Sequence, residues 1–170
     1  MNEHQQKQTF NEWLNSYKGI LFKVLRAYAF TADDRDDLFQ DMCLQLWHSI
    51  PNFRGEAAPT TWIYRVALNT AIRFTRKASR HRQTHQPLEG AEHLLRHNEA
   101  PADERLAWLY REIARLDPID RSLTLLLLDG CSYKEMAAIA GISESNVGVK
   151  IHRIKKHLIA RSEQYDYHGI

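Results

Sequence analysis

The chain has 170 residues, 44% of them hydrophobic, and a formal net charge of only +2, so it is long enough for one ordinary domain or two small ones with packed cores. No apolar run approaches the roughly 20 residues of a transmembrane helix, the polar start lacks the apolar stretch of a signal peptide, and two distant cysteines favour reduced thiols. We therefore expect a cytoplasmic protein that does not insert into a membrane.

Helical periodicity dominates residues 9–77, which we expect to form the first of two small domains. An apolar stripe at helical spacing begins at Trp13 and ends at Tyr28. Thr31 and Asp34 have the spacing of a capping box, with Asp in place of the usual Glu, and predict the start of a second helix.

Charges are segregated along the chain. Acidic residues crowd the second predicted helix, and basic residues follow in two clusters. This order indicates one protein partner and two nucleic-acid contacts, although a solvated helix face also explains each cluster taken alone. The acids are Asp33, Asp34, Asp36, Asp37 and Asp41; the first basic cluster is Arg65, Arg73, Arg76, Lys77, Arg80 and Arg82; the second is Lys150, Arg153, Lys155, Lys156 and Arg161.

The third predicted helix interleaves aromatic and basic side chains. Pro59 suits its first turn, because a missing N–H costs nothing there. Aromatic faces stack on unpaired bases and cations follow phosphates, so this composition indicates melted DNA as a ligand. Aromatic residues at helical spacing also pack inward as core, and that alternative stays open. The residues are Phe53, Arg54, Trp62, Tyr64, Arg65, Asn69, Arg73, Phe74 and Arg76.

The helical pattern fades over residues 78–102, where polar residues and prolines are frequent. We expect a flexible linker there, with a short helix at Glu92–His97. Residues 103–162 restart the pattern and should form the second domain.

Histidines spaced four apart in this linker leave a zinc-dependent enzyme as a remote alternative, because such pairs share one face of a helix. The pairs are His81 with His85, and His93 with His97. The zincin motif requires Glu directly after the first His, and Leu94 stands there instead. The chain also has no Gly-x-Ser-x-Gly elbow and no Gly-rich phosphate loop. We therefore expect no enzyme activity, catalytic residue, cofactor, metal or small-molecule substrate.

Local signals mark the helices of the second domain. Asp117 should cap a helix that has Pro118 in its first turn and Gly130 at its close. Ser132 and Glu135 have the spacing of another capping box and predict the start of the next helix.

The segment Tyr133–Lys156 has the pattern of a helix-turn-helix. Ala137 is small where two helices must cross, and Gly141 permits the tight turn between them. The outer face of the second helix is polar and basic, as contacts to phosphates and base edges in a major groove require, although a helical hairpin with a solvated face gives the same pattern. That face carries Ser145, Asn146, Lys150, His152, Arg153, Lys155 and Lys156.

Four motifs in order resemble the extracytoplasmic-function sigma factors, the smallest members of the bacterial sigma family. They are Asp37–Asp41, Phe53–Glu56, Thr61–Asn69 and Ser132–Ala137. The resemblance covers nearly the whole chain and implies an all-α fold of two small helical domains joined by a linker, the second a helix-turn-helix domain. It also implies an alternative sigma factor that binds RNA polymerase core and directs promoter-specific transcription initiation.

The resemblance further implies roles for particular residues. In the family, the helix matching Asp37, Gln40 and Asp41 docks on the clamp helices of the polymerase beta-prime subunit. The last helix reads the minus-thirty-five element as duplex DNA, and many members bind an anti-sigma factor. The residues implied to open and read the minus-ten element are Phe53, Arg54, Trp62, Arg65, Asn69 and Arg73.

Two departures from the family pattern predict a different promoter specificity. Pro59 stands where many relatives carry an aromatic residue. Gly148 stands where relatives often carry Arg, which removes a cation and costs up to about 1 kcal/mol of helix propensity. A helix-turn-helix regulator with a sensory N-terminal domain remains the alternative function, although the first half of the chain shows no ligand-pocket or receiver signature.

Overall fold

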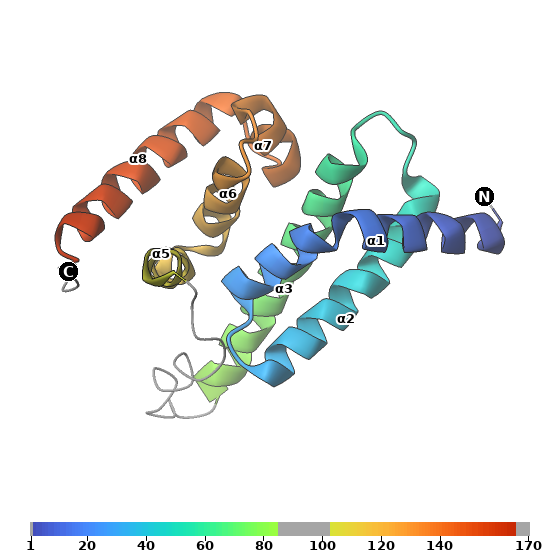
Figure 1. Cartoon of the computed structure of the whole chain (residues 1–170), viewed down its shortest axis with the longest axis horizontal. Coiled ribbons are helices and arrows are strands. Elements are labelled where there is room, and N and C mark those ends of the chain that lie inside the picture. Colours follow the sequence, from blue (N-terminus) through green and yellow to red (C-terminus); the bar gives the residue numbers. More distant parts are fainter. Residues whose placement is uncertain (1, 85–102, 166–170) are drawn as a thin grey trace. The chain divides into compact units, whose positions relative to one another are not determined.

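The computed structural model describes residues 2–84 and 103–165, without the side chains of 81–84. In these two stretches every regular element is a helix, which confirms the all-α prediction (Figure 1). The chain divides into two compact units, Met1–Tyr110 and Arg111–Ile170. None of the described helices is both long enough and apolar enough to cross a membrane.

The first unit is built from three long helices, α1 (Glu3–Tyr28), α2 (Ala32–Ser49) and α3 (Pro59–Thr84), which pack against one another, with a short 3-10 helix, η1 (Ile50–Asn52), after α2 (Figure 1). Each long helix turns an apolar stripe inward, because its buried side chains recur every three or four residues. The core residues with at most 1% exposure include Leu21, Val24, Leu38, Met42, Leu46, Ile63, Ala67 and Ala71.

The start of α1 lies earlier than the apolar pattern alone predicted. Asn2 and Gln5 form a capping box, in which each side chain accepts the backbone N–H of the other residue. The Gln6 side chain then donates to the backbone carbonyl of Trp47 at 2.8 Å. These polar contacts anchor a turn that has no apolar stripe of its own.

The end of α3 lies later than predicted. The helix continues past Lys77 to Thr84, because no proline or glycine interrupts this part of the sequence. The linker expected at 78–102 therefore overlaps α3. The rest of that segment, including the helix expected at Glu92–His97, lies outside the described residues.

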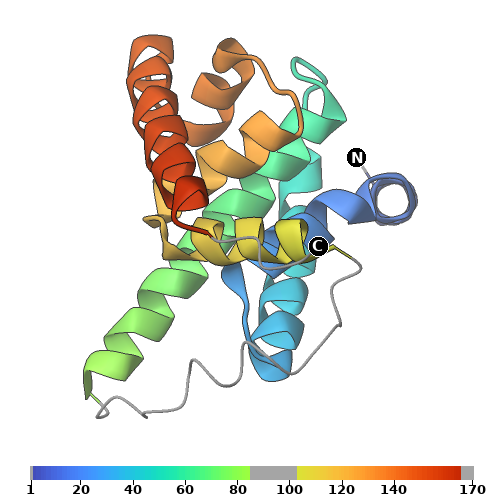
Figure 2. The same cartoon turned by 60° about the vertical axis from the view of Figure 1, so that its left-hand side comes forward.

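The second unit contains α6 (Pro118–Leu128), α7 (Tyr133–Ala140) and α8 (Glu144–Glu163), and the division between the units falls within α5 (Glu104–Arg115). α6 packs against both α7 and α8 (Figure 2) and is buried at every position from 121 to 126. The core of this unit includes the side chains of Ile113, Leu123, Leu125, Leu126, Met136, Ile139, Val147, Ile151 and Ile154.

The predicted helix caps are present, with one difference. Asp117 accepts the N–H groups of Ile119 and Asp120, both at 3.0 Å, and so caps α6 as expected. Thr31 Oγ1 accepts the Asp34 N–H at 3.0 Å and caps α2 by this single bond. An aspartate is one methylene shorter than the glutamate of a full capping box, which explains why this cap is half a box.

Candidate nucleic-acid interface

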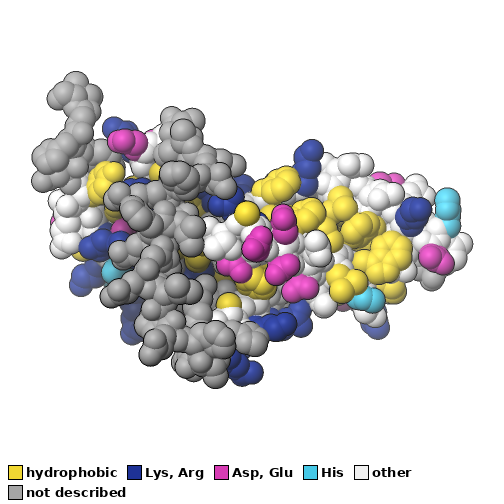
Figure 3. Space-filling view, turned by 90° about the horizontal axis from the view of Figure 1, so that it is seen from below, with side chains coloured by type: hydrophobic (Ala, Val, Ile, Leu, Met, Phe, Trp, Pro, Cys, Tyr) yellow, Lys and Arg dark blue, Asp and Glu magenta, His cyan; other side chains and the backbone are white. Residues whose placement is uncertain are grey.

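The acidic face of α2 points away from the core of the first unit. Asp37, Gln40 and Asp41 are all exposed, while Leu38 and Met42 on the other side of the helix are fully buried. Residues three and four apart share a helix face, so the two carboxylates and the amide form one surface. Figure 3 shows acidic side chains gathered beside apolar ones in the view from below.

An aromatic pair adds apolar area to α1 and α2. The rings of Phe22 and Phe39 stack with centroids 6.1 Å apart and planes 4° apart. Phe22 is 55% exposed. A stacked pair with one exposed ring is suited to contact with another macromolecule.

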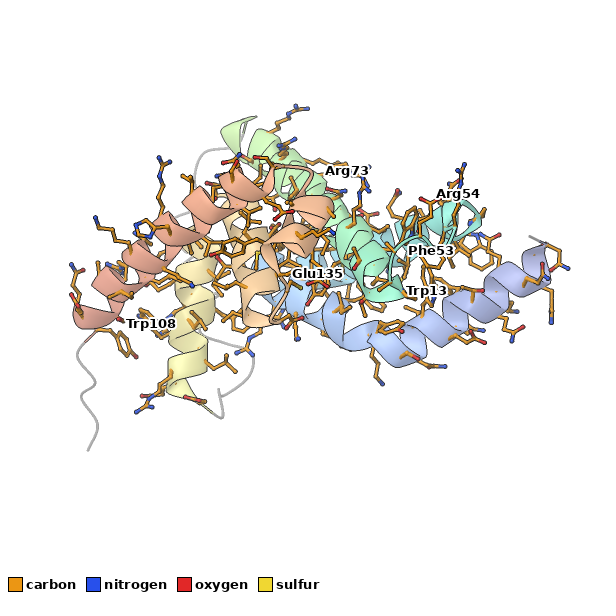
Figure 4. All side chains as sticks on the ribbon, turned by 90° about the horizontal axis from the view of Figure 1, so that it is seen from above. Trp13, Phe53, Arg54, Arg73, Trp108 and Glu135 are labelled. Carbon is orange, nitrogen blue, oxygen red and sulfur yellow. The ribbon has the colours of Figure 1, made fainter. Side chains whose placement is uncertain are left out.

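Three aromatic rings hold the loop between η1 and α3 in place. Phe53 makes edge-to-face contacts with Trp13, at 5.1 Å between centroids, and with Trp62, at 5.5 Å. The indole N–H of Trp62 donates to Ser49 Oγ at 3.0 Å. Trp13 is buried, whereas Phe53 and Trp62 are half-buried, so this cluster is part core and part surface. Figure 4 shows Phe53 beside Trp13, with Arg54 on the same loop.

The exposed face of α3 continues from this cluster as a polar and basic row. Arg65, Asn69 and Arg73 are spaced four apart and are all exposed. Tyr64 is one of the interleaved aromatic and basic residues of this helix in the sequence, but it is only 4% exposed and belongs to the core. Sequence spacing alone did not separate it from Trp62, since both are aromatic residues in the same turn.

The helix-turn-helix predicted for the second unit is present as α7 and α8. Ser132 and Glu135 form the predicted capping box, with the Ser132 N–H donating to Glu135 Oε2 at 2.7 Å, and this hydrogen bond lowers the pKa of Glu135. Gly141 has a φ of 70°, the left-handed conformation that favours glycine. Its N–H bonds to the Ala137 carbonyl at the turn, and Ser143 caps α8.

The outer face of α8 presents most of the residues predicted for it. Ser145, Asn146, His152, Arg153, Lys155 and Lys156 are exposed. Lys150 differs from them, because its Nζ lies 2.7 Å from Asp120 Oδ1 in an ion pair whose side chains are only 27% and 22% exposed. Its charge is therefore matched within the unit, and it joins α8 to α6.

A buried carboxylate clamps the far end of α8. Glu112 is 2% exposed, and it accepts hydrogen bonds from Arg161 at 3.0 and 3.1 Å and from Arg115 at 2.8 Å. The Arg161 hydrogen bonds lower the pKa of Glu112, with further lowering by the nearby positive charges. The sequence placed Arg161 in a basic cluster; in the structure this guanidinium pairs with Glu112.

Val149 on α8 is not among the residues predicted for this face, yet its apolar side chain is 49% exposed there. The glycine before it also has a structural neighbour. A Cβ at Gly148 would lie 3.6 Å from the Tyr133 ring, so the ring of α7 rests beside the bare backbone of α8.

Among the described residues no group of His, Cys, Asp and Glu side chains is arranged to hold a metal. The His81 side chain and all of His85, His93 and His97 lie outside the part of the chain that the structure describes.

Comparisons with known proteins agree with this geometry. The family model "Sigma-70 region 2" matches residues 13–81, and "Sigma-70, region 4" matches residues 106–158. An "ECF RNA polymerase sigma-E factor" of Haemophilus influenzae is 28% identical over 165 residues, covering 88% of this chain and 85% of its relative. An "RNA polymerase sigma-H factor" of Pseudomonas aeruginosa is 26% identical, with 88% and 84% covered.

Two solved structures share the fold. The structure of CnrH in complex with the cytosolic domain of CnrY superposes with a TM-score of 0.66 at 22% identity, covering 93% of this chain and 90% of the other. The sigma factor RpoE from Bartonella quintana, solved with the anti-sigma factor NepR, gives a TM-score of 0.69 at 19% identity, with 89% and 94% covered.

Proposed function

The chain belongs to the sigma-70 family as a two-domain extracytoplasmic-function sigma factor, and from this premise we propose how its surfaces divide the work of promoter-specific transcription initiation. Members of this family are transcription initiation factors and not enzymes; such a factor binds RNA polymerase core and selects the promoter. The observation that carries the function is the pair of matched sigma regions, the second of which contains a helix-turn-helix with an exposed basic face. The match of region 2 also favours a sigma factor over a regulator with a sensory N-terminal domain.

The acidic face of α2, formed by Asp37, Gln40 and Asp41, docks on the clamp helices of the polymerase beta-prime subunit. The proposal is supported by exposure, because all three side chains point outward from a helix whose buried residues are on the other side. A carboxylate surface of this kind is complementary to a basic partner.

The loop after η1 and the exposed row of α3 open and read the minus-ten element. Half-buried aromatic rings suit stacking on unpaired bases, and the exposed cations beside them suit the phosphates of a melted strand. The residues assigned to this role are Phe53, Arg54, Trp62, Arg65, Asn69 and Arg73.

Helix α8 reads the minus-thirty-five element in the major groove of duplex DNA. We assign this contact to Ser145, Asn146, His152, Arg153, Lys155 and Lys156, which are exposed, and assign to Lys150 the structural role of holding α8 to α6. An anti-sigma factor is a further partner, by analogy with the two solved complexes. The chain acts in the cytoplasm, where polymerase and promoter DNA meet.

Run-off transcription with purified core polymerase and a library of genomic fragments tests this function. We expect transcripts that depend on the chain and whose start sites share two upstream elements at constant spacing. The housekeeping sigma factor, added to the same core preparation, is the control for active polymerase. Transcripts from the control alone would contradict the proposal.

A paired substitution should separate base contacts from phosphate contacts on α8. Arg153→Ala should cost about 1–3 kcal/mol of binding free energy and relax preference at one base pair of the upstream element, because a guanidinium that bonds a base edge discriminates between bases. Lys156→Ala should weaken binding to all sequences alike and reduce the salt slope by about one unit. Binding of the holoenzyme to promoter variants over a salt series measures both, and equal behaviour of the two variants would contradict the division.

A change at Trp62 should affect strand opening and spare duplex binding. Trp62→Ala removes a ring that can stack on an unpaired base, which is worth about 1–3 kcal/mol per base, whereas Trp62→Phe keeps an aromatic face. Ser49→Ala is the matched control, because it removes the Trp62 hydrogen bond and leaves the ring. Permanganate oxidation of unstacked thymines reports opening, and a thermal melt checks the fold. Normal opening by folded Trp62→Ala would refute this role.

A further inference from the structure

Val149 occupies the centre of the outer face of α8. The buried stripe of this helix is Val147, Ile151 and Ile154, and at 100° per residue Val149 points roughly opposite to it. Its side chain is 49% exposed. The side chains around it on the same face are exposed and polar or basic: Ser145, His152, Arg153 and Lys156.

This valine contributes little to the stability of the unit. A β-branched side chain forms helix less readily than Lys, Arg or Ala, and a half-exposed one gains only part of the free energy of apolar burial. Its neighbours Gly148 and Ser145 are small, so no bulky side chain from those positions covers its methyl groups. The sequence therefore sets a projecting apolar group in the middle of a basic face.

The major groove of DNA offers one matching apolar group. Thymine carries a methyl group at C5, and the other base edges there present hydrogen-bond donors and acceptors. We propose that Val149 contacts the 5-methyl group of a thymine in the minus-thirty-five element and so helps to set promoter specificity. This inference rests on the proposed role of α8, and the exposed Arg153 and Lys156 beside Val149 supply the charge complementarity that brings DNA to this face.

The second exposed apolar residue of α8 provides a matched control. Ile159 is 59% exposed. It lies ten residues further along the helix, about 15 Å away at 1.5 Å per residue, and points in a different direction. One base pair cannot contact both side chains.

Replacing thymine by deoxyuridine tests the proposal, because this change removes only the 5-methyl group. The holoenzyme is bound to promoter duplexes in which each thymine of the upstream element, on either strand, is replaced in turn. We expect one position at which unsubstituted protein loses about fourfold in affinity, the value of one buried methyl-sized group. Val149→Ala should lose nothing at that position, whereas Ile159→Ala should lose as much as the unsubstituted protein.

Three outcomes separate the contact from the function on which it rests. The proposal is supported if replacing one particular thymine by deoxyuridine lowers the affinity of the unsubstituted protein and of Ile159→Ala but not that of Val149→Ala. The contact is overturned if the unsubstituted protein and Val149→Ala respond alike to deoxyuridine at every thymine. If Arg153→Ala still relaxes specificity in that case, the role of α8 stands. If Arg153→Ala also binds every promoter variant like the unsubstituted protein, both the contact and the role of α8 in promoter reading are overturned. Thermal melts show whether each variant is folded. We expect all of them to fold, because the substituted positions are exposed.

Discussion

Reversing Asp37 and Asp41 to Lys together should lower the affinity of the chain for RNA polymerase core by about a hundredfold. The two carboxylates share the exposed face of α2. Lysines at these positions would face a basic partner, and such repulsion between like charges costs several kcal/mol. Each tenfold loss of affinity corresponds to about 1.4 kcal/mol. The fold should survive, because exposed charges contribute about 1 kcal/mol or less to stability. Pull-down of core polymerase at moderate salt measures the loss.

A matched variant controls for net charge. Glu3→Lys with Glu12→Lys makes the same change of charge at exposed positions of α1, and it should bind core polymerase nearly as the unsubstituted chain does. The defect of the α2 variant should also depend on ionic strength, because exposed charges are screened by salt. Equal affinity of the two double variants would rule out the acidic face of α2 as the docking surface.

Glu112→Ala should lower the free energy of unfolding of the second unit by about 2–3 kcal/mol. The change removes a buried carboxylate that accepts three charged hydrogen bonds, and such bonds are among the strongest in proteins. The cost stays below that of a fully buried pair because both arginines reach solvent. Urea unfolding gives the free energy, and hydrogen exchange of the α2 amides in the first unit and the α8 amides in the second shows which unit is affected.

Arg115→Ala is the internal comparison for this clamp. Its side chain is 61% exposed, so its loss should cost about 1 kcal/mol or less. If Arg115→Ala destabilises the unit as much as Glu112→Ala, the ion pair between Glu112 and Arg161 is not the main contribution of this carboxylate to stability.

The ionisation of Glu112 should make the stability of the second unit depend on pH. The Arg161 hydrogen bonds lower the pKa of Glu112 in the folded state. The stabilisation is therefore present above the ordinary glutamate pKa of about 4.3 and is lost as the pH falls through the lower, folded value. Between neutral pH and acid, Glu112→Gln should lose less stability than the unsubstituted chain, since it has no charge to neutralise.

Local chemistry made much of the fold predictable from sequence. The Ser132–Glu135 box, the Asp117 cap and the left-handed Gly141 each depend on residues within a few positions of one another. The buried stripes of α2 and α8 follow from helical spacing alone. Such signals also located the helix-turn-helix and its basic face, because an exposed face is what remains once the buried stripe is assigned.

Only the tertiary structure decided which charged and aromatic side chains belong to the surface. Lys150 pairs with Asp120 and Arg161 pairs with Glu112, partners 30 and 49 residues away in sequence. No periodicity within one helix indicates such pairs, since they depend on how separate helices pack. For the same reason the half-buried Trp62, held by Ser49, became distinct from the buried Tyr64 only when α2 and α3 were brought together. The sequence by itself determined the helices and their faces; the packing between them determined which side chains on those faces remain available to a partner.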